Sequence, residues 1–207
     1  MATDLSQVAV ARALAKGIPC VQVDLDTQTL FSLVEITGEL PKTSAPSIAE
    51  FTQFLDREGE TIFIGISSKL SATLNNARLA GENLPSRSIH FIDSLNLSSG
   101  IGLLVLKAAD LRSQGYSAGY IEQSVSQAIP KVHSSFVIDT LDYLYKGGRC
   151  SAMSRIVGSL LKIRPVIEVR SDGTLGVKEK ITGSRKKALD SLIVDFQKHL
   201  LVMDTHR

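Results

Sequence analysis

Two short apolar segments, "TIFIGI" (61–66) and "SIHFID" (88–93), are each followed by a hydroxyl-rich turn and then by a helical segment. Short runs of β-branched and aromatic residues are typical of buried strands, and a repeated strand–turn–helix order is typical of a parallel sheet with crossover helices. In such a sheet the turns that follow the strands lie along one edge, where open α/β sheets bind their ligands. The order of segments therefore predicts an α/β fold with a ligand site at that edge.

Three segments in the first half of the chain are rich in hydroxyl groups. They are "ISSKLSAT" after the first of these strands, "DSLNLSSGIG" after the second, and "KTSAPS" before a helix that opens with the capping-box pair Ser47 and Glu50. Their candidate ligand residues are Thr43 and Ser44; Ser67, Ser68, Ser71 and Thr73; and Asp93, Ser94, Ser98, Ser99, Gly100 and Gly102.

Hydroxyl groups beside the positive end of a helix suit a carboxylate or a phosphate. For each turn taken alone, helix capping is the simpler interpretation, with Ser71 as the cap of the helix that follows it. Because two of the turns occupy the same position in the sheet, a shared ligand site is favoured over separate caps.

The second part of the chain has a different pattern. After residue 134 the sequence predicts a strand, two short helical segments within 140–163, a hairpin with Asp172-Gly173 at its turn, and an amphipathic final helix. We therefore expect two domains, an N-terminal α/β domain over 1–133 and a smaller α+β domain over 134–207. Residues 1–130 carry a net charge of −4 and residues 131–207 one of +6, which indicates a basic face for an anionic partner or an uneven scatter of lysines.

Composition excludes several classes of protein. With 43% hydrophobic residues the chain can bury a core, and its two cysteines make neither a disulfide framework nor a metal site. The sequence shows no signal peptide and no apolar run near the ~20 residues of a spanning helix, so we expect a cytoplasmic protein without stable membrane insertion. The basic residues are not interleaved with aromatic ones, which argues against nucleic acid as a partner.

Catalytic patterns are also missing. The chain has no G-x-S-x-G elbow, no phosphate-binding loop and no dinucleotide fingerprint, and its four histidines lack metal-ligand spacing. His90 lies within an apolar strand, where a core position is the expected role. We expect no catalytic residue, no metal and no cofactor. The alternative is a small enzyme acting on an anionic metabolite with Ser71 or Cys150 as nucleophile, although a positioned base is lacking.

Six segments in a fixed order carry a family resemblance: "PKTSAPS", "ISSKLSAT", "IDSLNLSSGIGLLVLKAA", "DTLDYLYKGGR", "GSLLKIRPVIEV" and "SRKKAL". Over roughly residues 3 to 192 the chain resembles the DegV family, the fatty-acid-binding proteins that serve bacterial fatty acid kinase. The resemblance implies a DegV-like (EDD) two-domain fold that encloses one long-chain fatty acid in an apolar tunnel. A separate kinase subunit would phosphorylate the ligand's carboxylate, and the chain itself would be a non-catalytic subunit.

The resemblance also implies roles for particular residues. By motif, Thr43 and Ser71 would be the principal carboxylate ligands, with Ser44, Ser67 and Ser68 close by, and Arg149 would lie on the surface that faces the kinase. The family's opening strand and its histidine-bearing C-terminal segment have no counterpart here, and the connection before "PKTS" is short. A truncated paralogue without lipid binding is therefore a further alternative.

Overall fold

The computed structural model describes residues 44–139 and 163–199, together with Ser32, Ile36, Leu141 and Leu144. The helix and strand expected within 8–25, and most of the two short helical segments expected within 140–163, lie outside these residues. The chain divides into two compact units, Met1–Ser134 with Ser171–Thr174, and Ser135–Arg170 with Leu175–Arg207.

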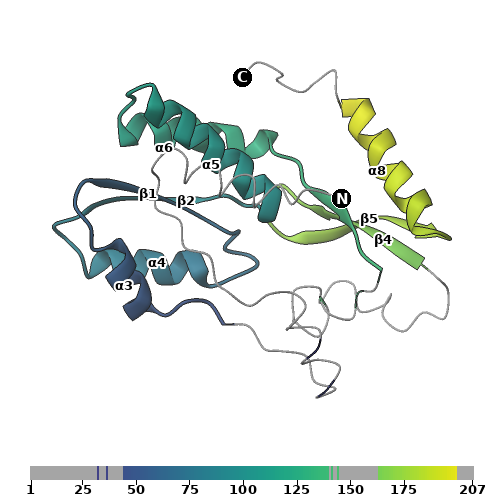
Figure 1. Ribbon diagram of the computed structural model, residues 1–207, viewed down its shortest axis with the longest axis horizontal. Coiled ribbons are helices and arrows are strands. Elements are labelled where there is room, and N and C mark those ends of the chain that lie inside the picture. Colours follow the sequence, from purple (N-terminus) through teal and green to yellow (C-terminus); the bar gives the residue numbers. More distant parts are fainter. Residues whose placement is uncertain are drawn as a thin grey trace. The chain divides into compact units, whose positions relative to one another are not determined.

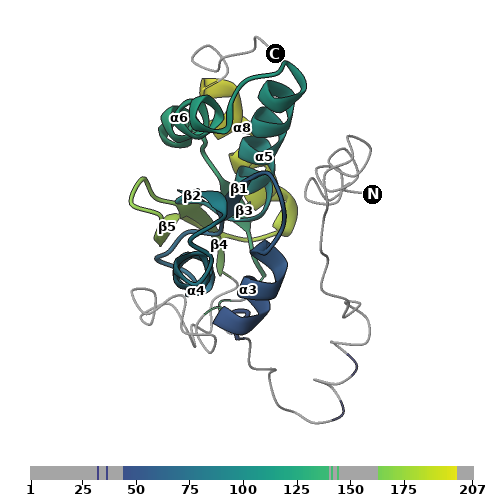
Figure 2. The same ribbon diagram turned by 90° about the vertical axis from the view of Figure 1, so that its left-hand side faces the viewer.

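In the first unit, helices and strands alternate along the chain. The elements are α3 (Ile48–Leu55), β1 (Glu60–Gly65), α4 (Thr73–Glu82), β2 (Ser88–Asp93), α5 (Ser98–Ser113), α6 (Ala118–Ala128) and a short 3-10 helix, η1 (Ile129–Lys131). β1 and β2 pair in parallel, with Glu60 opposite Ser88 and Gly65 opposite Asp93. α3 and α4 cover one face of this pair, and α5 and α6 cover the other (Figures 1 and 2). The predicted parallel arrangement is confirmed.

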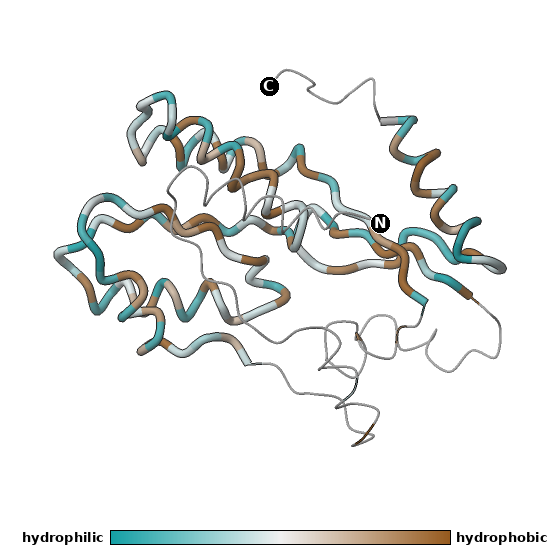
Figure 3. The backbone as a smooth tube through the Cα atoms, in the orientation of Figure 1, coloured by the Kyte–Doolittle hydropathy of each residue, from teal (hydrophilic) through white to brown (hydrophobic). Residues whose placement is uncertain are grey.

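The alternation of side chains along each strand gives the first unit two apolar layers. Towards α5 and α6 the strands contribute Ile62, Ile64 and Ile92, which pack with Leu104, Ile121 and Val125. Towards α3 and α4 they contribute Phe63, Ile89 and Phe91, which pack with Phe51, Leu55, Ala77 and Ala80. Figure 3 shows both strands as mostly apolar, as expected for a sheet that is covered on both faces.

Two helix starts follow the sequence pattern and one does not. Ser47 and Glu50 form the predicted capping box at α3, and Ser117 caps α6 through Tyr120 N. α5, however, begins at Ser98, so Ser98, Ser99, Gly100 and Gly102 lie in the helix and not in the turn where we expected them. The missing side chain at Gly100 makes this early start feasible, because a Cβ there would lie 2.1 Å from Asn96 Oδ1.

The second unit is a mixed α+β structure. β3 (Ser135–Val137), β4 (Ile163–Val169) and β5 (Leu175–Thr182) form an antiparallel sheet in the order β3-β4-β5, and α8 (Arg185–His199) follows. Ala188 and Leu192 of α8 pack against Val137, Val166 and Ile181. The predicted strand, hairpin and final helix are therefore confirmed. The helices within the described ranges all fall short of the length and hydropathy that a membrane span requires.

Candidate ligand-binding site

The turns that follow β1 and β2 lie side by side at the carboxyl ends of the two strands. The Asp93 carboxylate, at the end of β2, accepts hydrogen bonds from Ser68 N (3.3 Å) in the first turn and from Leu95 N (3.0 Å) in the second. Ser67 N donates to Asn96 O (2.9 Å), so the backbones of the two turns are also joined directly. The parallel register of the strands thus brings together two hydroxyl-bearing segments that are separate in the sequence.

Two of the site's serines use their hydroxyl protons within the protein. Ser67 Oγ donates to Gly173 O (2.8 Å) and accepts from Lys69 N (3.2 Å). Ser94 Oγ donates to Asn96 O (3.1 Å) and accepts from Asn96 N (3.1 Å). Both serines are 0% exposed. A serine hydroxyl has only one proton to donate, so in this conformation these two groups hold the turns in shape.

The pair formed by Ser71 and Thr73 has a proton to spare. Ser71 Oγ and Thr73 Oγ1 lie 2.8 Å apart, and Ser71 Oγ also accepts from Thr73 N (3.2 Å). Only one of the two hydroxyl protons can lie between the oxygens, so the other can be donated to a ligand. Both side chains are half-buried at the start of α4, whose N-cap position is occupied by Ala72 without a side-chain cap.

A side chain of α4 brings the remaining hydroxyl turn to the same place. Asn76 Nδ2, in the first turn of the helix, donates to Pro46 O (2.8 Å). Ser44 is exposed two residues before that proline, and Thr43, which precedes it, lies outside the described residues. The sequence analysis missed Asn76. The only signal in the sequence was a polar, poorly helix-forming residue near a helix start, which is common. Nothing in the local sequence relates Asn76 to Pro46, 30 residues away.

Among the residues that the structure describes, the site shows hydrogen-bond donors and no nucleophile paired with a base. His90 points from the middle of β2 to Glu122 of α6 (Nδ1 to Oε2, 2.7 Å) and does not approach the hydroxyl turns. Over the described ranges, no group of three or more His, Cys, Asp or Glu side chains is placed to hold a metal ion. Ser68, which lies in the same turn as Ser71, is exposed. Hydroxyl donors at a helix start can bind and orient an anion, but without a base they do not activate a nucleophile.

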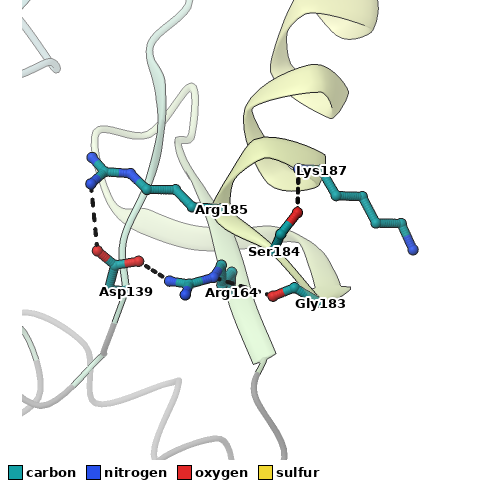
Figure 4. A network of polar contacts seen from close by, with 6 residues as sticks. All are labelled: Asp139, Arg164, Gly183, Ser184, Arg185 and Lys187. Carbon is teal, nitrogen blue, oxygen red and sulfur yellow. Dashed lines mark hydrogen bonds and ion pairs between the residues drawn. The ribbon is translucent and has the colours of Figure 1, made fainter.

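The predicted residues Arg149 and Cys150 lie outside the described residues. Asp139 forms ion pairs with Arg164 and with Arg185 (3.7 Å), and Arg164 Nε also donates to Gly183 O (3.3 Å) (Figure 4). Ser184 Oγ accepts from Lys187 N (3.3 Å) at the start of α8. Lys178 and Lys186 also form ion pairs, with Asp195 and Asp190. These cations are thus paired with acidic side chains of the same unit.

Comparison with known proteins finds a family match over most of the chain. Residues 21–201 match the family described as "Uncharacterised protein, DegV family". A DegV domain-containing protein of Clostridium acetobutylicum is 36% identical over 170 residues, which are 80% of this chain and 61% of the relative. The chain spans about three fifths of the length of the curated relatives it matches.

Solved structures agree with this match. A fatty acid binding DegV family protein from Streptococcus agalactiae superposes with a TM-score of 0.73 at 32% identity, covering 84% of this chain and 63% of that one. The fatty acid kinase (Fak) B3 protein of Streptococcus pneumoniae, loaded with linoleic acid, superposes with a TM-score of 0.73 at 30% identity, covering 84% of this chain and 64% of that one.

Proposed function

Since this chain belongs to the DegV family, we propose that it binds one long-chain fatty acid in an apolar tunnel and presents the carboxylate to a fatty acid kinase for phosphorylation. The similar structures support the ligand class, because one is described as fatty acid binding and another as a fatty acid kinase protein loaded with linoleic acid. In this proposal the chain carries the lipid, and the chemistry belongs to the kinase.

The observation that carries the proposal is the meeting of hydroxyl turns at the start of α4. Asp93 joins the turns after β1 and β2, and Asn76 holds the turn that contains Ser44. The Ser71–Thr73 pair keeps one proton for a ligand there. An uncharged set of donors next to a helix start suits a carboxylate, because each hydrogen bond to a charged acceptor is worth about 1.5–3 kcal/mol.

The hydroxyl residues have different roles in this proposal. Thr43 and Ser71 bind the carboxylate directly, and Ser44 and Ser68 lie close by and are exposed. Ser67 supports the site from within, because its proton goes to Gly173 O.

The proposed kinase docks on the basic domain over 134–207, while the domain over 1–133 holds the carboxylate. Arg149, which follows Gly147-Gly148 in a region with a net charge of +6, would contact that partner. Arg149→Ala should leave the lipid content unchanged and slow phosphorylation by the kinase. Added salt should slow phosphorylation of the unmutated protein in the same way. An Arg149→Ala protein that loses its lipid would instead assign this arginine to the ligand pocket.

The lipid-binding proposal is tested by mass spectrometry. The chain is expressed in bacteria, purified, and measured under native conditions, and the bound lipid is then extracted and identified. We expect about one acyl chain per protein and uptake of oleate by delipidated protein. A chain that is empty and stays empty with oleate contradicts the proposal. If that empty protein turns over an anionic substrate and loses this activity on thiol blocking or Ser71→Ala, the enzyme alternative is correct.

A further inference from the structure

The tip of the β4–β5 hairpin packs against the turns of the proposed carboxylate site. Gly173 is buried although its neighbours Ser171 and Asp172 are exposed, and its carbonyl accepts the hydroxyl proton of Ser67. Residues Ser171–Thr174 group with the first unit, whereas the strands on either side group with the second. The site therefore includes a segment that lies more than 100 residues after Ser67 in the chain.

This contact leaves no room for a side chain. A Cβ added at Gly173 would lie 2.3 Å from Ser67 Oγ, 3.1 Å from Leu95 Cδ2 and 3.2 Å from Leu95 Cα. Gly173 also has φ +83, in the left-handed region that favours glycine. Asp172 Oδ1 fixes the turn, because it accepts hydrogen bonds from both Thr174 N (2.9 Å) and Thr174 Oγ1 (2.7 Å). Gly173 is thus wedged between the first hydroxyl turn and the second.

The contact is transmitted to the ligand groups through Ser67. Its Oγ accepts from Lys69 N, and its carbonyl accepts from Leu70 N (2.9 Å) and Ser71 N (3.2 Å). The position of Ser67 therefore determines the backbone conformation from Ser67 to Ser71. A displacement of the Ser67 side chain would move the Ser71–Thr73 pair along with it.

We propose that Gly173 is a positioning residue of the carboxylate site, because its contact with the Ser67 hydroxyl fixes the position of the 66–72 turn. This inference rests on the proposed fatty-acid binding. Binding sites tolerate errors of only about 0.5 Å, whereas relieving a 2.3 Å approach to reach ordinary contact near 3.4 Å requires a shift of about 1 Å. Gly173 thus acts on affinity without touching the ligand.

The test compares Gly173→Ala with Gly59→Ala. Gly59 has the same φ of +83, but a Cβ there would meet nothing within 4 Å, so the control reproduces the backbone strain without the wedge. Affinity is measured as displacement of a fluorescent long-chain fatty acid by oleate, and stability as urea unfolding. We expect both variants to lose stability, and Gly173→Ala alone to bind oleate roughly tenfold more weakly or worse.

Ser67→Ala provides a second variant that keeps the hairpin backbone. In the ligand-free protein we expect faster hydrogen exchange of the Lys69 amide, which a serine acting only as a direct ligand would not cause. Because it removes the oxygen nearest the new Cβ, Ser67→Ala should also restore part of the affinity lost in Gly173→Ala. The double variant should therefore bind more tightly than Gly173→Ala alone.

The outcomes separate this inference from the function on which it rests. If the wild type binds no fatty acid, the proposed function fails and the positioning role fails with it. If the wild type binds and Gly173→Ala retains the wild-type dissociation constant, only the positioning role is refuted, and the hairpin tip is structural. If Gly173→Ala does not fold, an unchanged Lys69 exchange rate in Ser67→Ala refutes the positioning role by itself.

Discussion

Replacing Ser71 with alanine separates the two roles that a serine can have at a helix start. The substitution removes the acceptor for Thr73 N and the contact with Thr73 Oγ1. Because the N-cap of α4 is Ala72 and the Ser71 side chain is only half-buried, the loss of stability should be small, at most ~1 kcal/mol. The lost hydrogen bond to a carboxylate should cost about 1.5–3 kcal/mol of binding, or about 10- to 150-fold in affinity.

Ser117→Ala is the matched control. Ser117 is the N-cap of α6, where its hydroxyl accepts from Tyr120 N (3.4 Å) on an exposed part of the helix. This substitution should cost ~1 kcal/mol of stability and leave the affinity unchanged. The free energy of unfolding from urea titration and the dissociation constant for oleate are measured on each protein.

A particular pair of results would refute the assignment of Ser71. If Ser71→Ala loses stability as Ser117→Ala does and binds oleate as tightly as the wild type, Ser71 only starts the helix. If Ser71 and Thr43 both bind the carboxylate, the Ser71→Ala, Thr43→Ala double variant should bind oleate about 100-fold more weakly or worse while the fold is retained.

Three further predictions concern the surroundings of the site. Asn76→Ala should weaken oleate binding by releasing the turn that contains Ser44 and Pro46, while circular dichroism shows an unchanged helix content. Gly100→Ala should lower the free energy of unfolding by about 1–3 kcal/mol in urea titration, because the new Cβ would lie 2.1 Å from Asn96 Oδ1. Hydrogen bonds to the Glu50 carboxylate lower its pKa, chiefly the bond from the Ser47 backbone N–H and next the bond from the Ser47 hydroxyl. The capping box should therefore stabilise the start of α3 fully above the ordinary glutamate pKa, and this stabilisation should be lost as the pH falls through the lowered pKa. An NMR titration of the Ser47 amide checks this, and Glu50→Gln should abolish the pH dependence.

Local patterns in the sequence were sufficient for the order and type of the main helices and strands within the described residues. The capping box of Ser47 and Glu50 joins residues three apart, and Asp172-Gly173 forms a turn whose strands are adjacent in the chain. Signals of this kind need no knowledge of distant residues. The start of α5 was misplaced because two glycines and two serines are typical of a turn, and only the close packing of Gly100 on Asn96 shows why they lie in a helix.

The sequence by itself determined that hydroxyl groups would gather at the carboxyl ends of neighbouring parallel strands, because the strand–turn–helix order leaves those turns no other place. It did not determine which hydroxyls keep a proton for a ligand. Ser67 and Ser71 are hydroxyl candidates of the same turn, yet Ser67 donates to Gly173 O, 106 residues away, whereas Ser71 shares its bond with Thr73. One proton can serve only one acceptor, and the nearest acceptor is set by tertiary packing across the fold.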